Sequence, residues 1–277
     1  IPFSMEADSV NSAILSPSAN EATIDLFVRE VFREMTTKAG QKCTAIRRAF
    51  VPQALLEQVQ QKLSAKLEKV VVGDPQKQDT TMGALASPKQ KLDVAAKVAE
   101  LAKEAKIVFG GETTFKINAD YPEKGAFFPP TLLRCEQPLQ ASLVHTTEAF
   151  GPVCTLMPYQ SIEELADLVA RGEGSLVASV VKNADENIEQ IIQKIAPWHG
   201  RVHILDEESA KESTGHGSPL PHLVHGGPGR AGGGEHRGGA QARDRCPADR
   251  RLDHPAARKA HHVPPRHEAR DAERDAP

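Results

Sequence analysis

Helix-like and strand-like segments alternate along most of this chain, and this alternation constrains the fold more than any other feature of the sequence. Between positions 21 and 38, apolar residues such as Ile24, Phe27 and Val31 recur at steps of three and four, as in an amphipathic helix. The apolar run at 46–51 predicts a strand after it. Further helices are expected at 52–67, 88–105, 161–170 and 185–195, and further strands at 106–109, 126–133, 153–158, 176–181 and 201–205. This order predicts an α/β domain with a mostly parallel sheet flanked by helices.

A compositional break near position 235 limits this domain to the first part of the chain. Residues 236–277 carry nine arginines, one lysine and five histidines but no aromatic residue, whereas residues 1–235 carry 16 lysines and eight arginines. A segment with so few branched aliphatic residues cannot bury enough apolar surface to fold. We therefore predict a folded domain over 1–235 and a disordered tail over 236–277. A native basic arm and a shift of reading frame near Glu235 both account for such a tail.

Composition also argues against several classes of protein. No stretch approaches the roughly 20 apolar residues that a membrane helix needs. Four widely spaced cysteines without a Cys-x-x-Cys pair, and the histidines His216, His222 and His225 without a neighbouring cysteine or carboxylate, give no metal-ligand pattern and no disulfide framework. The tail holds ten basic and seven acidic residues, a net charge of +3, and no aromatic ring to stack on bases. We expect a cytoplasmic protein with no membrane, nucleic-acid or metal partner.

Cys43 is the candidate nucleophile of the sequence. It lies in a short polar turn between an expected helix and an expected strand, and Lys42, Arg47 and Arg48 flank it. Nearby cations favour the thiolate, which is the nucleophilic form of cysteine. The alternative for any single cysteine is a buried and inert side chain. We give that interpretation to Cys135 and Cys154, which lie in apolar, strand-like surroundings.

Two carboxylates are further candidates because of their surroundings. Glu6 lies near an apolar, strand-like stretch that would raise its pKa and suit it to act as a base. Glu148 precedes a turn at 149–152 that leads into a strand, where a carboxylate can accept hydrogen bonds from sugar hydroxyls. A solvated surface carboxylate is the alternative for both residues.

Five short motifs follow one another in a fixed order along the chain. They are Phe3-Ser4-Met5-Glu6, Gly40-Gln41-Lys42-Cys43, Gly110-Gly111, GAFFPPT at 125–131 and EAFGPV at 148–153. Together they resemble the aldehyde dehydrogenase superfamily. Within it, the stretches 6–11, 35–48 and 207–221 resemble the subfamily that cleaves the ring in phenylacetate degradation, where this domain is often fused to an enoyl-CoA hydratase-like domain. The dehydroadipyl-CoA semialdehyde dehydrogenases of benzoyl-CoA degradation share much of the pattern and are the alternative.

The resemblance implies a reaction and a role for four residues. Cys43 would attack the aldehyde, with its own backbone N–H as one oxyanion donor, and Glu6 would activate the water that hydrolyses the resulting thioester. Glu148 and Phe150 would hold the nicotinamide ribose and ring of NADP or NAD. The implied substrate is a CoA-linked semialdehyde from aromatic-acid degradation. The Gly- and His-rich segment 213–235 would lie near the substrate entrance, and full-length members are expected to be homo-oligomers.

The family also implies parts that these motifs do not include. An asparagine that stabilises the oxyanion, and most of a Rossmann-like cofactor domain, would lie upstream of the segment around Glu6. Beyond Glu235 the residues no longer resemble the family. We therefore expect a catalytic-domain fragment with impaired oxidation but a reactive Cys43, and we favour the frame shift over a native arm for 236–277.

Two other functions stay open from the residues alone. Cys43 is compatible with a thiol hydrolase, which needs a histidine base near the sulfur. The histidines available for that role are His145, His199, His203 and His216. The other function is a binding module whose basic tail contacts phosphate groups, although the tail's low net charge argues against it.

Overall fold

The computed structural model describes residues 8–111 and 115–212 of the chain. The strands are β1 (Asn11–Leu15), β2 (Ile46–Pro52), β3 (Lys106–Phe109), β4 (Thr131–Arg134), β5 (Val153–Tyr159), β6 (Ser175–Val181) and β7 (His199–Leu205). The α-helices are α1 (Glu21–Thr36), α2 (Leu56–Leu67), α3 (Pro88–Leu101), α4 (Leu143–Thr146), α5 (Ile162–Ala170), α6 (Glu189–Ile195) and α7 (Ser209–Glu212). Short 3₁₀ helices lie at Thr37–Gly40, Gln53–Leu55, Pro122–Lys124 and Ala196–Trp198.

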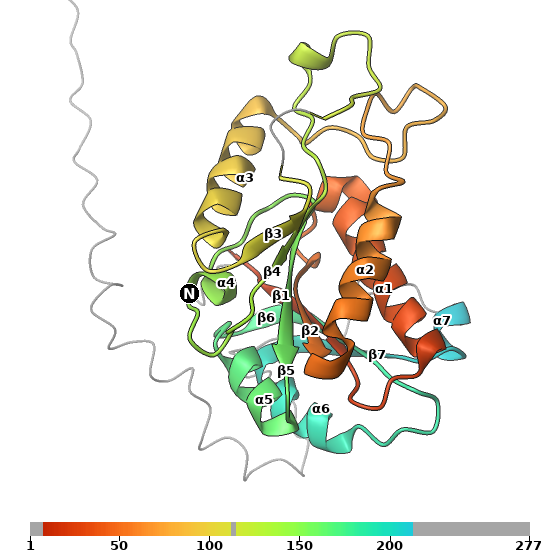
Figure 1. The fold of residues 1–277 in the computed structure, drawn as a ribbon, viewed down its shortest axis with the longest axis vertical. Coiled ribbons are helices and arrows are strands. Elements are labelled where there is room, and N and C mark those ends of the chain that lie inside the picture. The colour runs from red at the N-terminus through yellow and green to blue at the C-terminus, as the bar shows by residue number, and fades with distance from the viewer. Residues whose placement is uncertain (1–7, 112–114, 213–277) are drawn as a thin grey trace, which may run out of the picture. The chain divides into compact units, whose positions relative to one another are not determined.

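The strands of the described residues form one sheet. Their order is β3-β4-β5-β2-β1-β6-β7, and neighbouring strands are parallel except for the antiparallel pair β3 and β4. Helices cover both faces of this sheet (Figure 1). The predicted fold class, an α/β domain with a mostly parallel sheet flanked by helices, is therefore confirmed.

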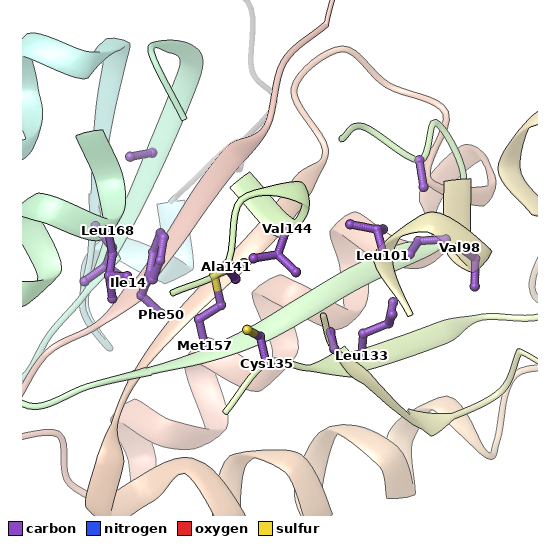
Figure 2. Close-up of a cluster of buried hydrophobic side chains, with 14 of the residues drawn as sticks. Ile14, Phe50, Val98, Leu101, Leu133, Cys135, Ala141, Val144, Met157 and Leu168 are labelled. Carbon is purple, nitrogen blue, oxygen red and sulfur yellow. The ribbon is translucent and has the colours of Figure 1, made fainter. Parts of the chain in front are cut away.

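Each face of the sheet carries its own hydrophobic core. Side chains alternate between the two faces along a strand, so Ile14 and Phe50 lie in one core while Leu15 and Val51 lie in the other. Helices α3, α5 and α6 cover the first core, part of which is drawn in Figure 2. Helices α1 and α2, which pack against each other, cover the second (Figure 1). Because both faces are covered, the central strands β2 and β5 are buried along their whole length.

Polar side chains cap the starts of the helices. Asn20 Oδ1 accepts the Thr23 backbone N–H at 2.9 Å and so caps α1. The helix begins at Glu21, as predicted. Ser161 Oγ accepts the Glu164 backbone N–H at 3.1 Å in the same way at the start of α5. Each cap satisfies a backbone donor that has no partner within its helix.

The strand predicted at 126–133 is wrong in its extent. Only β4 is a strand, and it begins at Thr131. Pro129 and Pro130 come directly before it, and their nitrogens have no hydrogen to donate to a neighbouring strand. The apolar character of 126–128 serves burial in the core instead.

The start of the helix predicted at 52–67 is also wrong. Pro52 is the last residue of β2 and pairs in register with Tyr159 of β5. A short 3₁₀ helix follows, and α2 begins at Leu56. Strand pairing at Pro52 therefore overrides the preference of proline for the first turn of a helix.

Several predictions concern segments outside the described residues. These are Glu6, the loop at 213–235 and the tail at 236–277. Over residues 8–111 and 115–212, none of the helices has both the length and the apolar content required to cross a membrane.

Candidate active site

The turn that carries Cys43 is set by an abrupt end of α1. The helix ends at Thr36. Lys38, Ala39 and Gly40 then take left-handed backbone conformations, with φ of 54°, 51° and 69°. This conformation is unfavourable for residues that carry a side chain. The chain next passes through Cys43 and enters β2, so contacts from the rest of the domain must hold the turn in place.

Exposure separates Cys43 from the other cysteines that the structure describes. Cys43 is exposed, whereas Cys135 and Cys154 are buried in the core, as predicted. Burial raises the pKa of both core thiols, that of Cys154 to about 12. The core thiols are therefore protonated at neutral pH, and Cys43 is the accessible thiol of the described residues.

Asn11 holds the backbone at Cys43 from the start of β1. Its fully buried side chain donates from Nδ2 to the carbonyl oxygen of Cys43 at 2.8 Å and to that of Ala45 at 3.1 Å. Its Oδ1 accepts the backbone N–H of Val177 in β6 at 3.0 Å. The turn is thereby tied to two strands. Asn11 was not among the residues predicted for the site, and its one signal in the sequence is that the polar pair Asn11-Ser12 opens an apolar strand.

The cations that flank the thiol in sequence have other partners in space. Lys42 Nζ lies 2.7 Å from Oε2 of Glu34, whose side chain is buried. Arg47 Nε lies 3.1 Å from Oε1 of Glu148. Arg48 is fully buried and donates to backbone oxygens on the core side of the sheet. These charges are balanced by carboxylates or committed to carbonyl groups, rather than left free beside the sulfur as the sequence had led us to expect.

Arg47 joins the turn before β2 to the loop at 148–151. On the side of the turn, its guanidinium donates to the carbonyl oxygen of Gly40 at 2.9 Å. On the side of the loop, it donates to the carbonyl oxygen of Gly151 at 2.7 Å and to Glu148. Its Cζ lies 5.4 Å from the centre of the Phe150 ring, within cation–π range. Two segments that are about 100 residues apart in sequence therefore meet at one side chain.

Glu148 is nearly buried and is held at both oxygens. Oε1 accepts from Arg47 Nε, and Oε2 accepts the Ser9 backbone N–H at 2.9 Å. Burial raises the pKa of Glu148, while Arg47 and the Ser9 N–H act in the opposite direction. Each oxygen of a carboxylate has two acceptor sites, so both oxygens keep one for a further donor.

A cleft of about 570 Å³ opens beside this loop. Its lining includes Glu148 and Phe150 and, from α3, Gln90, Asp93 and Lys97. The four carboxylates of the lining, Asp8, Asp93, Glu100 and Glu148, can accept hydrogen bonds from the hydroxyl groups of a ligand, and Phe150 offers an aromatic face to a flat ring. Cys43 is not among the described residues that line the cleft.

The structure thus brings together part of the set that the sequence predicted. The turn with Cys43 and the loop with Glu148 and Phe150 lie against each other through Arg47. Glu6 lies outside the described residues, so its predicted position stays a prediction.

The histidines considered as bases for a thiol hydrolase are engaged elsewhere. The ring nitrogens of His145 lie 2.8 Å from the carbonyl oxygen of Pro138 and 3.3 Å from a nitrogen of Arg48. Those of His199 lie 2.9 Å from the Ile195 carbonyl oxygen and 3.4 Å from the Ser12 hydroxyl. His203 lies 3.3 Å from the Ser179 hydroxyl, and His216 lies outside the described residues. The contacts of His145 and His199 give no support to a thiol hydrolase.

We expect the domain to lose stability as the pH falls from about 6.5 to about 4. Burial lowers the pKa of both His145 and His199 to about 4. The unfolded chain takes up protons near pH 6.5 and the folded chain does not, so protonation favours unfolding by up to about 3 kcal/mol per histidine. Urea unfolding at several pH values measures this loss. In the variant His199→Gln, the free energy of unfolding should depend less steeply on pH. A pH dependence equal to that of the native chain would show that His199 does not contribute to the loss of stability.

Replacing Gly40 by alanine should displace the turn that carries Cys43. An added Cβ would lie 2.1 Å from the carbonyl oxygen of Gly151, and the φ of 69° disfavours any side chain. We expect the free energy of unfolding to fall by at least about 1–2 kcal/mol, with altered alkylation of Cys43. The control is Gly83→Ala, where the added Cβ meets only Pro75 Cγ at 3.3 Å. Equal losses in the two variants, measured by urea unfolding, would refute this account of the turn.

Comparison with known families decides what kind of domain carries this site. The model of the aldehyde dehydrogenase family matches residues 1–242. The chain belongs to the aldehyde dehydrogenase family. The match includes the segment around Glu6, the turn with Cys43 and the loop with Glu148 and Phe150, and it confirms the resemblance seen in the motifs. It ends at residue 242, a little beyond Glu235, where the resemblance was expected to end.

Two curated proteins illustrate the similarity of the chain to known sequences. The 3,4-dehydroadipyl-CoA semialdehyde dehydrogenase of Aromatoleum evansii is 42% identical over 231 residues, which are 82% of this chain and 45% of the relative. The Protein MaoC of Klebsiella aerogenes is 50% identical over 162 residues, which are 58% of this chain and 47% of the relative. The chain thus spans about half the length of these relatives.

Solved structures of aldehyde dehydrogenases share the fold. A betaine aldehyde dehydrogenase mutant from Staphylococcus aureus, solved in complex with NAD+ and with a BME-modified cysteine, has a TM-score of 0.61 and 25% identity, covering 73% of this chain and 39% of that structure. A mutant of the 1-pyrroline-5-carboxylate dehydrogenase of Thermus thermophilus has a TM-score of 0.65 at 21% identity, and the match covers 80% of this chain and 39% of that structure. The second likeness supports the fold alone.

Proposed function

We propose that the enzyme to which this chain belongs oxidises an aldehyde to an acid with NAD or NADP, and that Cys43 is its nucleophile. The observation that carries the proposal is the placement of Cys43. It is an exposed thiol on a turn that Asn11 and Arg47 hold against the loop of Glu148 and Phe150. The membership of the chain in the aldehyde dehydrogenase family supports the reaction class.

The residues around the cleft fit a nicotinamide ribose. Both Glu148 oxygens retain an acceptor site for ribose hydroxyls, and Phe150 offers an aromatic face beside the same cleft. When bound, the dinucleotide accepts the hydride that leaves the aldehyde carbon. The role of Glu148 and Phe150 is to fix that acceptor close to the carbon attached to Cys43, because hydride transfer needs the two within a few ångström.

The remaining steps rest on groups of this chain. The Cys43 sulfur adds to the aldehyde carbon, and the Cys43 backbone N–H stabilises the oxyanion that forms. Loss of hydride leaves a thioester on the sulfur. Water then hydrolyses it, and we propose Glu6 as the base that takes the proton from this water.

For the substrate we propose a CoA-linked semialdehyde from aromatic-acid degradation. The support is the relative from Aromatoleum evansii, which is named as a 3,4-dehydroadipyl-CoA semialdehyde dehydrogenase. A semialdehyde of the phenylacetate route, which the motifs at 6–11 and 35–48 favour, is the other candidate of the same chemical class. Parallel assays with the two CoA thioesters separate them by the ratio of their kcat/KM values.

The proposal is tested by following reduction of NAD and of NADP at 340 nm with a CoA-linked semialdehyde. We expect one reduced cofactor for each acid formed in the enzyme encoded by the complete gene. Because the 277 residues span about half of the relatives, we expect them alone to react at Cys43 but to reduce little cofactor. Absence of cofactor reduction by the complete enzyme with any CoA-linked semialdehyde would overturn the proposal.

A further inference from the structure

We propose that Arg47 is a positioning residue that sets the distance between the nucleophile and the cofactor-binding loop. The inference rests on the proposed function of Cys43, Glu148 and Phe150. It goes beyond that function because Arg47 itself contacts neither the aldehyde nor the hydride in this account. Its task is to make two separate backbone segments behave as one unit.

The geometry places one guanidinium between the two segments. Toward the nucleophile it donates to the carbonyl oxygen of Gly40 at 2.9 Å and reaches that of Lys42, directly before Cys43, at 3.5 Å. Toward the cofactor loop it donates to the carbonyl oxygen of Gly151 at 2.7 Å and to Glu148 at 3.1 Å. A displacement of either segment therefore breaks a charge-assisted hydrogen bond.

The backbones at Gly40 and Gly151 lie so close together that a side chain does not fit between them. A Cβ at Gly40 would lie 2.1 Å from the Gly151 carbonyl oxygen, so the two backbones are nearly in contact where Arg47 bonds to both. Two carbonyl groups that point into one buried space repel each other unless a donor lies between them. The guanidinium supplies that donor to both.

An arginine suits this place better than a lysine. The Arg47 side chain is 4% exposed, and that of its partner Glu148 is 5% exposed. A buried cation is retained when several acceptors satisfy it. The planar guanidinium presents five donors in fixed directions, whereas an ammonium has three donors on a flexible stem. Lysine at this position would keep the positive charge but lose some of the hydrogen bonds that join the two segments.

A second route between the segments lets the variants fold. The Ser9 backbone N–H donates to Glu148, the Ser9 hydroxyl lies 2.8 Å from Asn11 Oδ1, and Asn11 donates to the Cys43 carbonyl oxygen. This route runs through Ser9 and the first residue of β1 and does not involve Arg47. Removal of the guanidinium should therefore loosen the site without unfolding the domain.

The test compares Arg47→Gln and Arg47→Lys with Arg134→Gln in the enzyme from the complete gene. Arg134 is the matched control, because it also lies on a strand of this sheet and pairs with carboxylates, Glu57 and Glu136, that are exposed. We expect Arg47→Gln to raise the KM for the cofactor by about tenfold or more and to lower kcat as well. For Arg47→Lys, the KM for the cofactor and kcat should lie between those of Arg47→Gln and those of the native enzyme. Arg134→Gln should change neither the KM nor kcat.

A second readout uses the 277-residue chain and needs no turnover. Peptide-resolved alkylation reports the reactivity of Cys43, and protection of the buried Cys135 and Cys154 reports whether each variant is folded. We expect Arg47→Gln to change the alkylation rate of Cys43 severalfold while the buried pair stays protected. Glu148→Gln should raise the cofactor KM but leave Cys43 alkylation nearly unchanged.

The outcomes separate the two proposals. If the native enzyme fails to reduce the cofactor, the proposed function fails, while Cys43 alkylation still tests the hold of Arg47 on the turn. If the native enzyme is active and a folded Arg47→Gln variant matches Arg134→Gln in KM, kcat and Cys43 alkylation, the positioning role is overturned. A purely structural arginine would lower the yield of folded enzyme and leave the KM of the folded fraction unchanged.

Discussion

Replacing Cys43 by serine should lower kcat/KM for aldehyde oxidation by at least about 10³-fold, because loss of a nucleophile removes the covalent route. A serine hydroxyl is a poor nucleophile without an adjacent base, and Cys43 is the exposed thiol among the described cysteines. Cofactor reduction by the enzyme from the complete gene measures the loss. Cofactor binding, followed by fluorescence, should stay within severalfold of the native value because Glu148 and Phe150 are intact.

The matched control for this substitution is Cys135→Ala. Cys135 is buried in the first core and carries a thiol with a raised pKa, so it takes no part in the proposed chemistry. Its substitution should cost about 1 kcal/mol or less of stability and leave kcat within a few-fold. If Cys43→Ser kept activity, or if Cys135→Ala lost it to the same degree, Cys43 would not be the nucleophile.

Replacing Arg48 by methionine should lower the free energy of unfolding by about 3 kcal/mol or more. Its guanidinium donates to the carbonyl oxygens of Val10 at 3.0 Å and Leu168 at 3.1 Å and to the Ser12 hydroxyl at 3.2 Å. Truncation would leave the two carbonyl oxygens buried without this donor, at about 1–3 kcal/mol each. Burial lowers the pKa of Arg48 to about 9, so the side chain is still charged at neutral pH. Urea unfolding at pH 7 measures the effect.

Arg134→Met serves as the comparison for Arg48→Met. Arg134 pairs with Glu57 and Glu136, whose side chains are 62% and 60% exposed, and such pairs contribute about 0–1 kcal/mol. The unfolding midpoint in urea should therefore move much less than for Arg48→Met. Similar losses in the two variants would show that the buried hydrogen bonds of Arg48 do not carry the stability assigned to them.

The fold was predictable because local patterns and global packing agree in this chain. The repeat in α1, the cap at Asn20 and the apolar runs of β2 and β5 each define an element without help from the rest of the structure. Several boundaries were wrong: the helix predicted at 185–195 begins at Glu189 and the one predicted at 88–105 ends at Leu101, and two further errors fall on prolines. At Pro52, pairing with Tyr159 across the sheet determined the boundary, and no local sequence window shows that pairing. At Pro129 and Pro130 the missing backbone donors determined it, and that signal is present in the sequence.

The sequence named candidate residues for the site but did not reveal the contacts between them. The motifs pointed to Cys43, Glu148 and Phe150. The sequence presented Arg47 as a cation acting on the thiol, whereas in the structure it bonds to the loop at 148–151. Asn11 gave almost no signal. Both residues act through long-range contacts, and a single sequence does not reveal which distant segments meet.

The central claim is that Cys43 becomes acylated during aldehyde oxidation. The most direct measurement is rapid acid quenching of the complete enzyme during turnover of a CoA-linked semialdehyde, followed by mass spectrometry of the peptide that contains Cys43. The account predicts a mass increase equal to the acyl group on Cys43, present only when both aldehyde and oxidised cofactor are supplied, and absent in Cys43→Ser. An active enzyme whose acyl group appears on another residue, or whose Cys43→Ser variant turns over normally, would contradict it.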